Sequence, residues 1–256
     1  MKRKRRIAAV MLSLLCAACV PAVPYQTACG ITAHAAEVVD SGTCGKNAKW
    51  QLDSDGTLTV SGTGTMDGSS DRNPIPWKAE KDSIKKVVIA RGITNVGEQS
   101  FDGCKNLTSI SLSDTVTSID VSAFSSCTAL TSAVIPDSVT SIGTFAFCLC
   151  KSLTDITIPS SVKRIGSLAF SGTSWLDQEI KKSPFVIVNG ILIYGPDTEE
   201  AEIPSGVTCI VSNAFYSRNS IKKLTIPDTV TVIEHNAFIE CSELVSTCCD
   251  YARPGF

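Results

Sequence analysis

The histidines of this chain are the first residues to consider for catalysis. There are two, and His34 lies in an N-terminal leader described below, which leaves His235, next to Glu234. A nucleophilic serine or cysteine needs a positioned base and a group that orients it. No nucleophile motif and no metal-ligand spacing accompany His235. We therefore expect neither nucleophilic nor metal-dependent catalysis.

Three clustered carboxylates offer another chemistry. Glu199, Glu200 and Glu202 could supply the acid and base pair of a glycosidase. They fall on a single predicted strand, however, where successive side chains alternate between faces. A solvated acidic stripe is the expected outcome. The sequence thus predicts a protein that is not an enzyme and that uses no cofactor.

Cysteines are numerous, and their spacing suggests something other than catalysis. The chain has twelve, of which three lie in the leader and nine, an odd number, remain. Four of the nine occupy one position of a repeat: Cys104, Cys127, Cys150 and Cys241. We expect them to stack as small, buried, free thiols. A disulfide between neighbouring coils is the alternative, although three consecutive stacked cysteines cannot all pair with one another.

The spacing of these cysteines reflects an internal repeat of constant length. Copies begin at an apolar residue in most cases and cover more than half of the chain. Their first residues are Ile84, Leu107, Leu130, Leu153, Thr198 and Ile221, and Leu244 opens a seventh, incomplete copy. A period of 20–29 residues that opens with L-x-x-L-x-L is the signature of leucine-rich repeats.

Each position of the repeat has a structural role, numbered here as an offset from its first residue. Apolar residues at offsets 0, 3 and 5 predict a half-buried strand, which Pro ends at offset 6 in four copies. A second apolar pair at offsets 9 and 12 turns the chain back across the core. Ala-Phe follows at offsets 16 and 17, as in Ala146-Phe147. Only stacking of coils can bury these side chains, so we expect the Phe residues to form one continuous core column.

The framework L-x-x-[IV]-x-I-P-x-x-V-x-x-I-x-x-x-A-F-x-x-C resembles the BspA-like leucine-rich repeat family of bacterial surface and secreted proteins. The resemblance implies a β-rich, horseshoe-like solenoid of parallel strands with short irregular or helical turns. It also implies adhesion to proteins of host or neighbouring cells. The matching residues are core residues, so the resemblance is specific for the fold and says little about the ligand.

Two stretches interrupt or cap the repeats. In 177–197, "FVIV-NG-ILIY" predicts an inserted β-hairpin with Asn189-Gly190 at its turn. We expect this hairpin to leave the stack, either as a spacer or as a projecting ridge. In 37–80, "KWQL-DSDG-TLTV" predicts a hairpin cap in which Trp50 and Trp77 cover the first coil.

The N-terminus reads as a secretory signal peptide. Five basic residues precede an apolar run too short to span a bilayer, and Ala33-His34-Ala35 is an A-x-A cleavage pattern. A lipoprotein signal ending at Cys19 fits less well, because Cys16 stands where a Leu-type residue is expected. Cleavage near Ala35/Ala36 would leave 18 basic and 25 acidic residues. We therefore expect a secreted or surface-associated protein that has no membrane span and does not bind nucleic acid.

The predicted organisation follows from these features. It consists of a signal peptide (1–36), a β-rich cap (37–80), repeats 1–4 (81–176), the hairpin insertion (177–197), repeats 5 and 6 (198–247) and a tail (248–256).

The resemblance implies a partner-binding concave face, formed by the non-core positions of the first strand of each repeat. We call the residues at offsets 1 and 2 the first-strand face, to which offset 4 contributes as well. The face comprises Lys85, Lys86, Thr108, Ser109, Thr131, Ser132, Thr154, Asp155, Glu199, Glu200, Lys222 and Lys223. It lacks the aromatic anchors typical of binding hot spots.

The predicted function is therefore weak, avidity-dependent binding of a protein or glycan on a host or neighbouring cell. The alternatives are a structural module that self-associates through its uncapped C-terminal coil, and an accessory domain of an enzyme.

Overall fold

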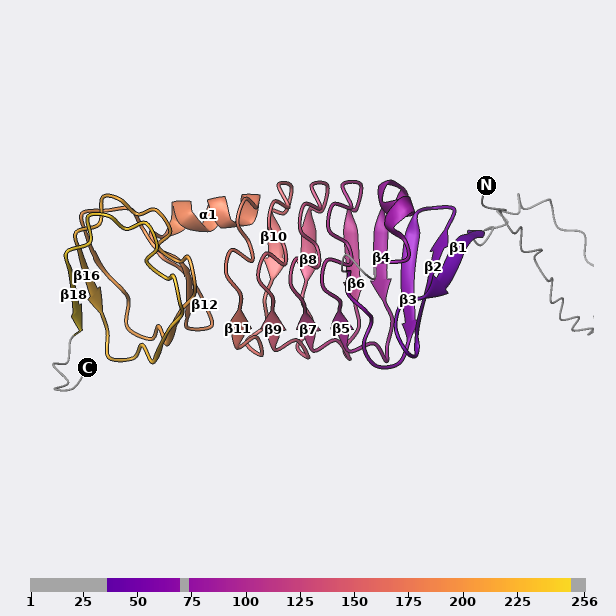
Figure 1. Cartoon of the computed structure of the whole chain (residues 1–256), viewed down its shortest axis with the longest axis horizontal. Coiled ribbons are helices and arrows are strands. Elements are labelled where there is room, and N and C mark those ends of the chain that lie inside the picture. Colours follow the sequence, from indigo (N-terminus) through magenta and orange to yellow (C-terminus); the bar gives the residue numbers. More distant parts are fainter. Residues whose placement is uncertain (1–35, 70–73, 250–256) are drawn as a thin grey trace, which may run out of the picture. The chain divides into compact units, whose positions relative to one another are not determined.

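The computed structural model describes residues 36–69 and 74–249; residues 1–35 of the predicted signal peptide lie outside the described residues. The described part of the chain forms a stack of coils, which runs from right to left in Figure 1. Each coil contributes a first strand and, in most cases, a short second strand. The fold is a parallel β-solenoid with little helix, as predicted.

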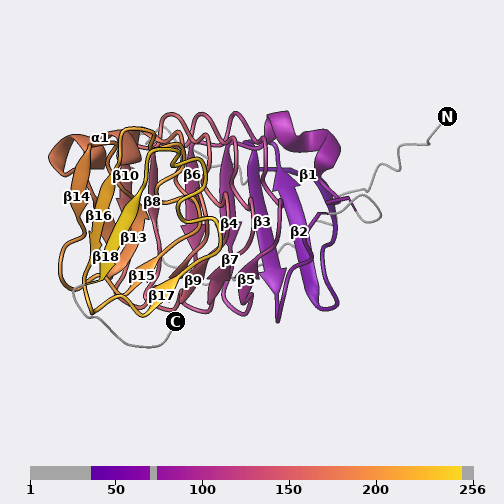
Figure 2. The same ribbon diagram turned by 60° about the vertical axis from the view of Figure 1, so that its left-hand side comes forward.

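The first strands lie side by side in the stack (Figures 1 and 2). They form three hydrogen-bonded groups, β3-β4-β6, β8-β10 and β14-β16-β18, with all neighbours parallel. Their bounds are β3 (Thr57–Gly62), β4 (Lys86–Ile89), β6 (Ser109–Leu112), β8 (Ser132–Val134), β10 (Asp155–Thr157), β14 (Glu200–Glu202), β16 (Lys223–Ile226) and β18 (Ser246–Cys249). Strand β18 thus extends into the predicted tail.

The second strands form the other side of each coil. Two parallel groups, β5-β7-β9-β11 and β13-β15-β17, carry the apolar residue of offset 12. Their bounds are β5 (Asn95–Val96), β7 (Ser118–Ile119), β9 (Ser141–Ile142), β11 (Arg164–Ile165), β13 (Ile191–Tyr194), β15 (Cys209–Ile210) and β17 (Val232–Ile233).

The core column of aromatic rings holds the coils together. Phe101, Phe124, Phe147 and Phe170 stack with centroids 5.4–5.8 Å apart. All four rings are buried, and so are the second-strand residues beside them. Because repeats 1–4 have the same length, the same ring recurs at the same place in each, so the predicted column is confirmed there. The expectation of one continuous column is wrong, because the segment 177–197 has no equivalent ring and Phe215 pairs separately with Phe238.

The predicted hairpin of the cap is confirmed as β2 (Ala48–Asp53) and β3, and a further strand, β1 (Val38–Thr43), extends it. These three strands form an antiparallel sheet that continues in parallel into β4. The short 3₁₀ helix η1 (Lys78–Ser83) follows Trp77. Trp77 stacks on Phe101 at 5.5 Å, and its Nε1 donates a hydrogen bond to the carbonyl of Ser100. Trp50 packs edge-on against Trp77, so two indoles close this end of the column.

The segment 177–197, which we call the short coil, differs from the prediction. Its hairpin is confirmed, since β12 (Val186–Val188) pairs antiparallel with β13. The expectation that it leaves the stack is wrong, because β13 pairs in parallel with β15 and continues the second-strand side. Asn189 at the hairpin turn donates to the carbonyls of Pro159 and Val162 in repeat 4. The hairpin is therefore a spacer within the stack.

Helix α1 (Ser174–Lys182) stands where the short coil would otherwise have a first strand. Thr173 caps it by accepting a hydrogen bond from the N–H of Leu176, and Lys181 and Lys182 lie in its last turn, as the helix dipole favours. Trp175 packs edge-on against Phe170 at 5.0 Å and ends the aromatic column there.

Each repeat ends in a turn segment, which we define as offsets 14–22. Its structure was not predicted from the sequence. Its backbone N–H groups donate to carbonyls of the next coil, as Phe147 does to Ala169 and Leu149 to Ser171. Offsets 15 and 19 adopt left-handed φ values, in most cases without glycine. The residues at offset 15 are Gln99, Ser122, Phe145, Leu168, Asn213 and Asn236.

The cysteines at offset 20 bond within this segment. The thiols of Cys127 and Cys150 donate to the carbonyls of Phe101 and Phe124 in the preceding repeat, at 3.2 and 3.0 Å. Cys241 does the same to Phe215. A small apolar side chain with a weak donor suits a buried position that faces a carbonyl. The described cysteines up to Cys241 are free thiols, as expected from the sequence.

Truncating the core column should unfold the stack. Phe147→Ala removes a buried ring that contacts two others, so we expect a loss of about 3–5 kcal/mol in the free energy of unfolding. Urea denaturation measures it. Phe145→Ala is the control, because Phe145 is 38% exposed and should cost far less. Equal effects of the two changes would contradict the register.

Candidate functional site

The first-strand face lies where the sequence placed it. All twelve residues are exposed except Ser109, which is half-buried. Residues of equal offset become neighbours on adjacent strands, for example Ser132 opposite Asp155. The short coil has no first strand, so β10 and β14 are not hydrogen-bonded to each other. Helix α1, in place of a first strand, therefore separates the part of the face on repeats 1–4 from the part on repeats 5 and 6.

On repeats 5 and 6 the charged residues of the face pair with one another. Lys222 Nζ lies 2.6 Å from a carboxylate oxygen of Glu199, and Lys223 Nζ lies 3.7 Å from one of Glu200. The hydrogen bond from Lys222 lowers the pKa of the Glu199 carboxyl, and the same bond raises the pKa of Lys222. Both pairs are exposed, so salt will screen them. These four charges largely satisfy each other.

On repeats 2–4 the face carries mainly hydroxyl groups, with Asp155 as its charged residue, whereas repeat 1 contributes Lys85 and Lys86. Thr108 and Thr154 donate to the carbonyls of Lys85 and Thr131 in the preceding repeats. Val134 at offset 4 lies opposite Thr157 and is 68% exposed. An apolar side chain this exposed on a regular strand has no role in the core. Val134 is thus the one apolar contact that the middle of the face offers a partner.

The candidate catalytic groups are not brought together. His235 is exposed, and the carboxylate of Glu234 accepts a hydrogen bond from the backbone N–H of Ser212 instead of orienting the imidazole. Within residues 36–69 and 74–249, no three His, Cys, Asp or Glu side chains are grouped so that they could hold a metal ion. In the same residues no helix is both long and apolar enough to cross a membrane.

The buried thiols are expected to react slowly. Burial raises the pKa of Cys44 to about 12 and that of Cys104 to about 12. Cys148 and Cys209 are only half-buried, and burial raises the pKa of each. Since the thiolate is the reactive form, these cysteines are poor nucleophiles.

Comparison with known proteins agrees with this geometry. A sequence profile described as the BspA type leucine rich repeat region matches six copies, over residues 79–192 and 194–250. No protein of curated function matches the chain.

Similar solved structures are bacterial leucine-rich repeat proteins. One from Eubacterium ventriosum has 24% identity and a TM-score of 0.51, over 82% of this chain and 72% of that one. At this identity it shows the fold alone. A T. pallidum leucine-rich repeat protein (23%, TM-score 0.42, 79% and 90%) and a leucine-rich cell surface protein from Faecalibacterium prausnitzii (21%, 0.36, 81% and 76%) are less similar in structure.

Reversing one charge of the Glu199–Lys222 pair should destabilise the fold only at low salt. Glu199→Lys or Lys222→Glu alone places like charges side by side, whereas the double exchange restores an opposite pair. We expect a lower urea midpoint for each single variant in low salt, recovery in the double variant, and no difference in 1 M salt. Single variants that match the parent in low salt would show that the pair does not form.

Alkylation tests the state of the thiols. At pH 8 a thiol of pKa about 12 is ionised in about one molecule in ten thousand. In the folded protein we expect iodoacetamide to label Cys148 and Cys209 before Cys104, and all three to react in denaturant. Peptide mass spectrometry reports the order. Native labelling of Cys104 as fast as of Cys148 would contradict its burial.

Proposed function

The chain belongs to the BspA-type leucine-rich repeat family, and from this membership we propose that it is a secreted or cell-surface, non-catalytic binding protein. Its partner is a protein or glycan on a host or neighbouring cell. Contact is made through the first-strand face, with its centre on repeats 2–4.

One observation carries this proposal. Side chains of the first-strand face stand exposed on a regular array of parallel strands, and none of them is needed for the core. On repeats 2–4 this array presents hydroxyl groups around Val134, which suits a neutral polypeptide or a sugar. The net acidic charge of the chain after residue 36 supports the exclusion of nucleic acid. Because aromatic anchors are missing from the face, we expect weak single contacts that gain strength from multivalency.

A second candidate function is self-association. Val232 and Ile233 on β17 are 49% and 48% exposed, whereas the equivalent Ile142 and Ile165 of inner repeats are buried. A second copy that stacked on β17 would bury these residues, so this surface favours a structural module that assembles end to end.

Two exposed valines separate the two candidates. Purified residues 37–256 would be screened against extracellular-matrix proteins, mucins and whole bacterial cells, and sized by light scattering over a range of concentrations. For the binding protein, we expect Val134→Arg to weaken partner binding at least about tenfold, because an exposed apolar contact is lost and a charge is added. Val232→Arg is the matched control and should leave that binding unchanged.

If the protein instead forms larger species as its concentration rises, if Val232→Arg abolishes them, and if no partner binds saturably, self-association replaces partner binding as the function. Partner binding that both variants retain would place the contact away from the first-strand face.

A further inference from the structure

The short coil lacks two residues where the turn segment begins. From the apolar residue of the second strand to the core Phe the spacing is five, as in Ile165–Phe170 and Ile210–Phe215. In the short coil the equivalent pair is Leu192 and Gly195. The equivalence is visible in the backbone, since the N–H of Gly195 donates to Ala214 as that of Phe215 donates to Ala237. The shorter path leaves space beside repeat 4.

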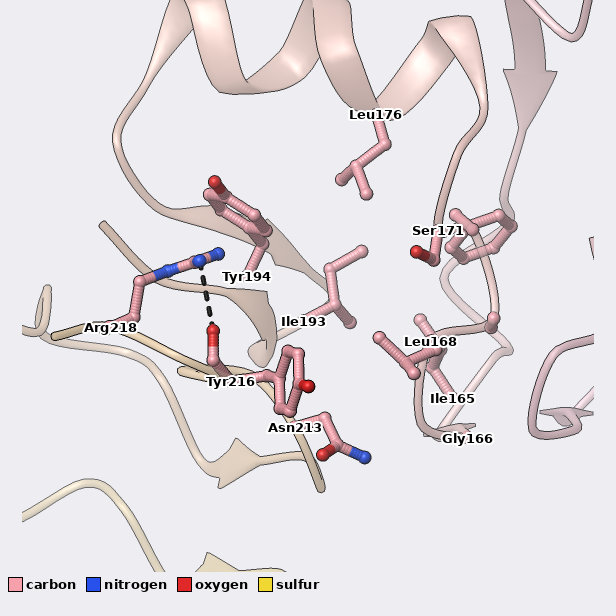
Figure 3. A pocket seen from close by; sticks show the side chains of 12 residues that line it. Ile165, Gly166, Leu168, Ser171, Leu176, Ile193, Tyr194, Asn213, Tyr216 and Arg218 are labelled. Atoms are coloured by element: carbon pink, nitrogen blue, oxygen red, sulfur yellow. Dashed lines mark hydrogen bonds between the residues drawn. The ribbon is translucent and has the colours of Figure 1, made fainter. Parts of the chain in front are cut away.

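This space is a cavity of about 150 Å³ between repeat 4, the short coil and repeat 5. Figure 3 shows Leu168, Leu176 and Ile193 converging on it from three segments of the chain. Phe170 and Ala169 also line it, so much of its wall is apolar. A cavity of this size accepts a single benzene ring.

Two backbone N–H groups at the cavity lack a hydrogen-bond acceptor. In repeats 1–3 the N–H groups at offsets 15 and 17 bond to the following coil, as those of Phe145 and Phe147 do. Among the described residues, the N–H groups of Leu168 and Phe170 have no such acceptor. Phe170 is only 2% exposed, and a buried N–H that is not hydrogen-bonded is rare in folded proteins. A ligand that carries an acceptor would satisfy these groups.

A positive charge at the cavity also favours a ligand with a hydrogen-bond acceptor. Among the described residues that line it, Arg218 is the only charged one. Its Nε and Nη1 donate to the carbonyls of Gly195 and Tyr216, and its guanidinium lies 4.4 Å from the ring centroid of Tyr194. The guanidinium is therefore held at the cavity with its Nη2 still free among the described contacts, and it favours an anion.

Leu168 is strained where it lines the cavity. Its φ is +54°, a conformation that bulky residues disfavour and that Asn tolerates, as at Asn213 and Asn236. Leu at this position therefore destabilises the turn while placing an apolar side chain against the cavity. The same conformation occurs at offset 15 of every repeat, so it is a property of the turn segment that Asn can adopt at lower cost than Leu.

We propose that this cavity binds an aromatic carboxylate of single-ring size. The ring lies against Leu168, Leu176 and Ile193, and the carboxylate accepts from the free N–H groups of repeat 4. Arg218 lies across the cavity, where its positive charge favours an anionic ligand. The site uses no residue of the first-strand face, so it can be tested independently of partner binding.

Benzoate is the probe, with benzylamine as a control of equal size and opposite charge. Titration of purified residues 37–256, followed by ¹H–¹⁵N amide shifts, should show saturable binding of benzoate with Kd of about 1 mM. The amides of Leu168 and Phe170 should shift most. Absence of saturation at 20-fold that concentration, or equal binding of benzylamine, would overturn the proposal.

Leu168→Asn separates binding from stability. It relieves the left-handed strain, so the unfolding midpoint should stay the same or rise, but it removes an apolar wall and should weaken benzoate about tenfold. Phe145→Asn makes the same change one repeat earlier, outside the cavity, and should leave benzoate binding unchanged. Equal binding by both variants would rule out this cavity as the site.

Discussion

The structure depends on one constraint: a coil of this chain can bury its apolar residues only against the same residues of its neighbours. A repeat of constant length meets this constraint because it returns each side chain to the same height. The stacked Phe rings are the direct result, and the strand pairing and the ladder of turn hydrogen bonds follow the same register. The surface inherits that order, so side chains at the same outward offset lie side by side on adjacent strands even where their chemistry differs.

Much of this could be read from the sequence, because periodicity reports packing. Phe147, Ile142 and Leu130 each have counterparts at the same offset in the neighbouring repeats, and their burial followed from that fact. The two tryptophans of the cap were foreseeable as large apolar residues next to an otherwise open column. The outward positions of the first strands could be predicted for the same reason, as every second residue of a half-buried strand faces solvent.

Other features could not be read, because they depend on departures from the repeat. The ion pair between Glu199 and Lys222 could have been predicted, since both residues stand at offset 1 of successive repeats. That prediction requires the further step that residues of equal offset are neighbours on adjacent strands. The pairing of β13 with β15 could not be predicted. Two missing residues change the path of the backbone, and no sequence pattern marks where the chain rejoins the stack. Left-handed φ at Phe145 and Leu168 runs against residue preference and so leaves no local signal.

The short coil also divides the molecule energetically. In stacked repeats, stability is roughly the sum of each repeat and its coupling to the next, so a weak junction limits how far order spreads. At the junction after repeat 4 the aromatic column stops at Trp175, and the turn ladder is broken. Repeats 1–4 with their cap, and repeats 5 and 6, are therefore two blocks with limited cooperativity between them. Under tension, the seam between these blocks would open first and absorb extension while the capped block stays folded.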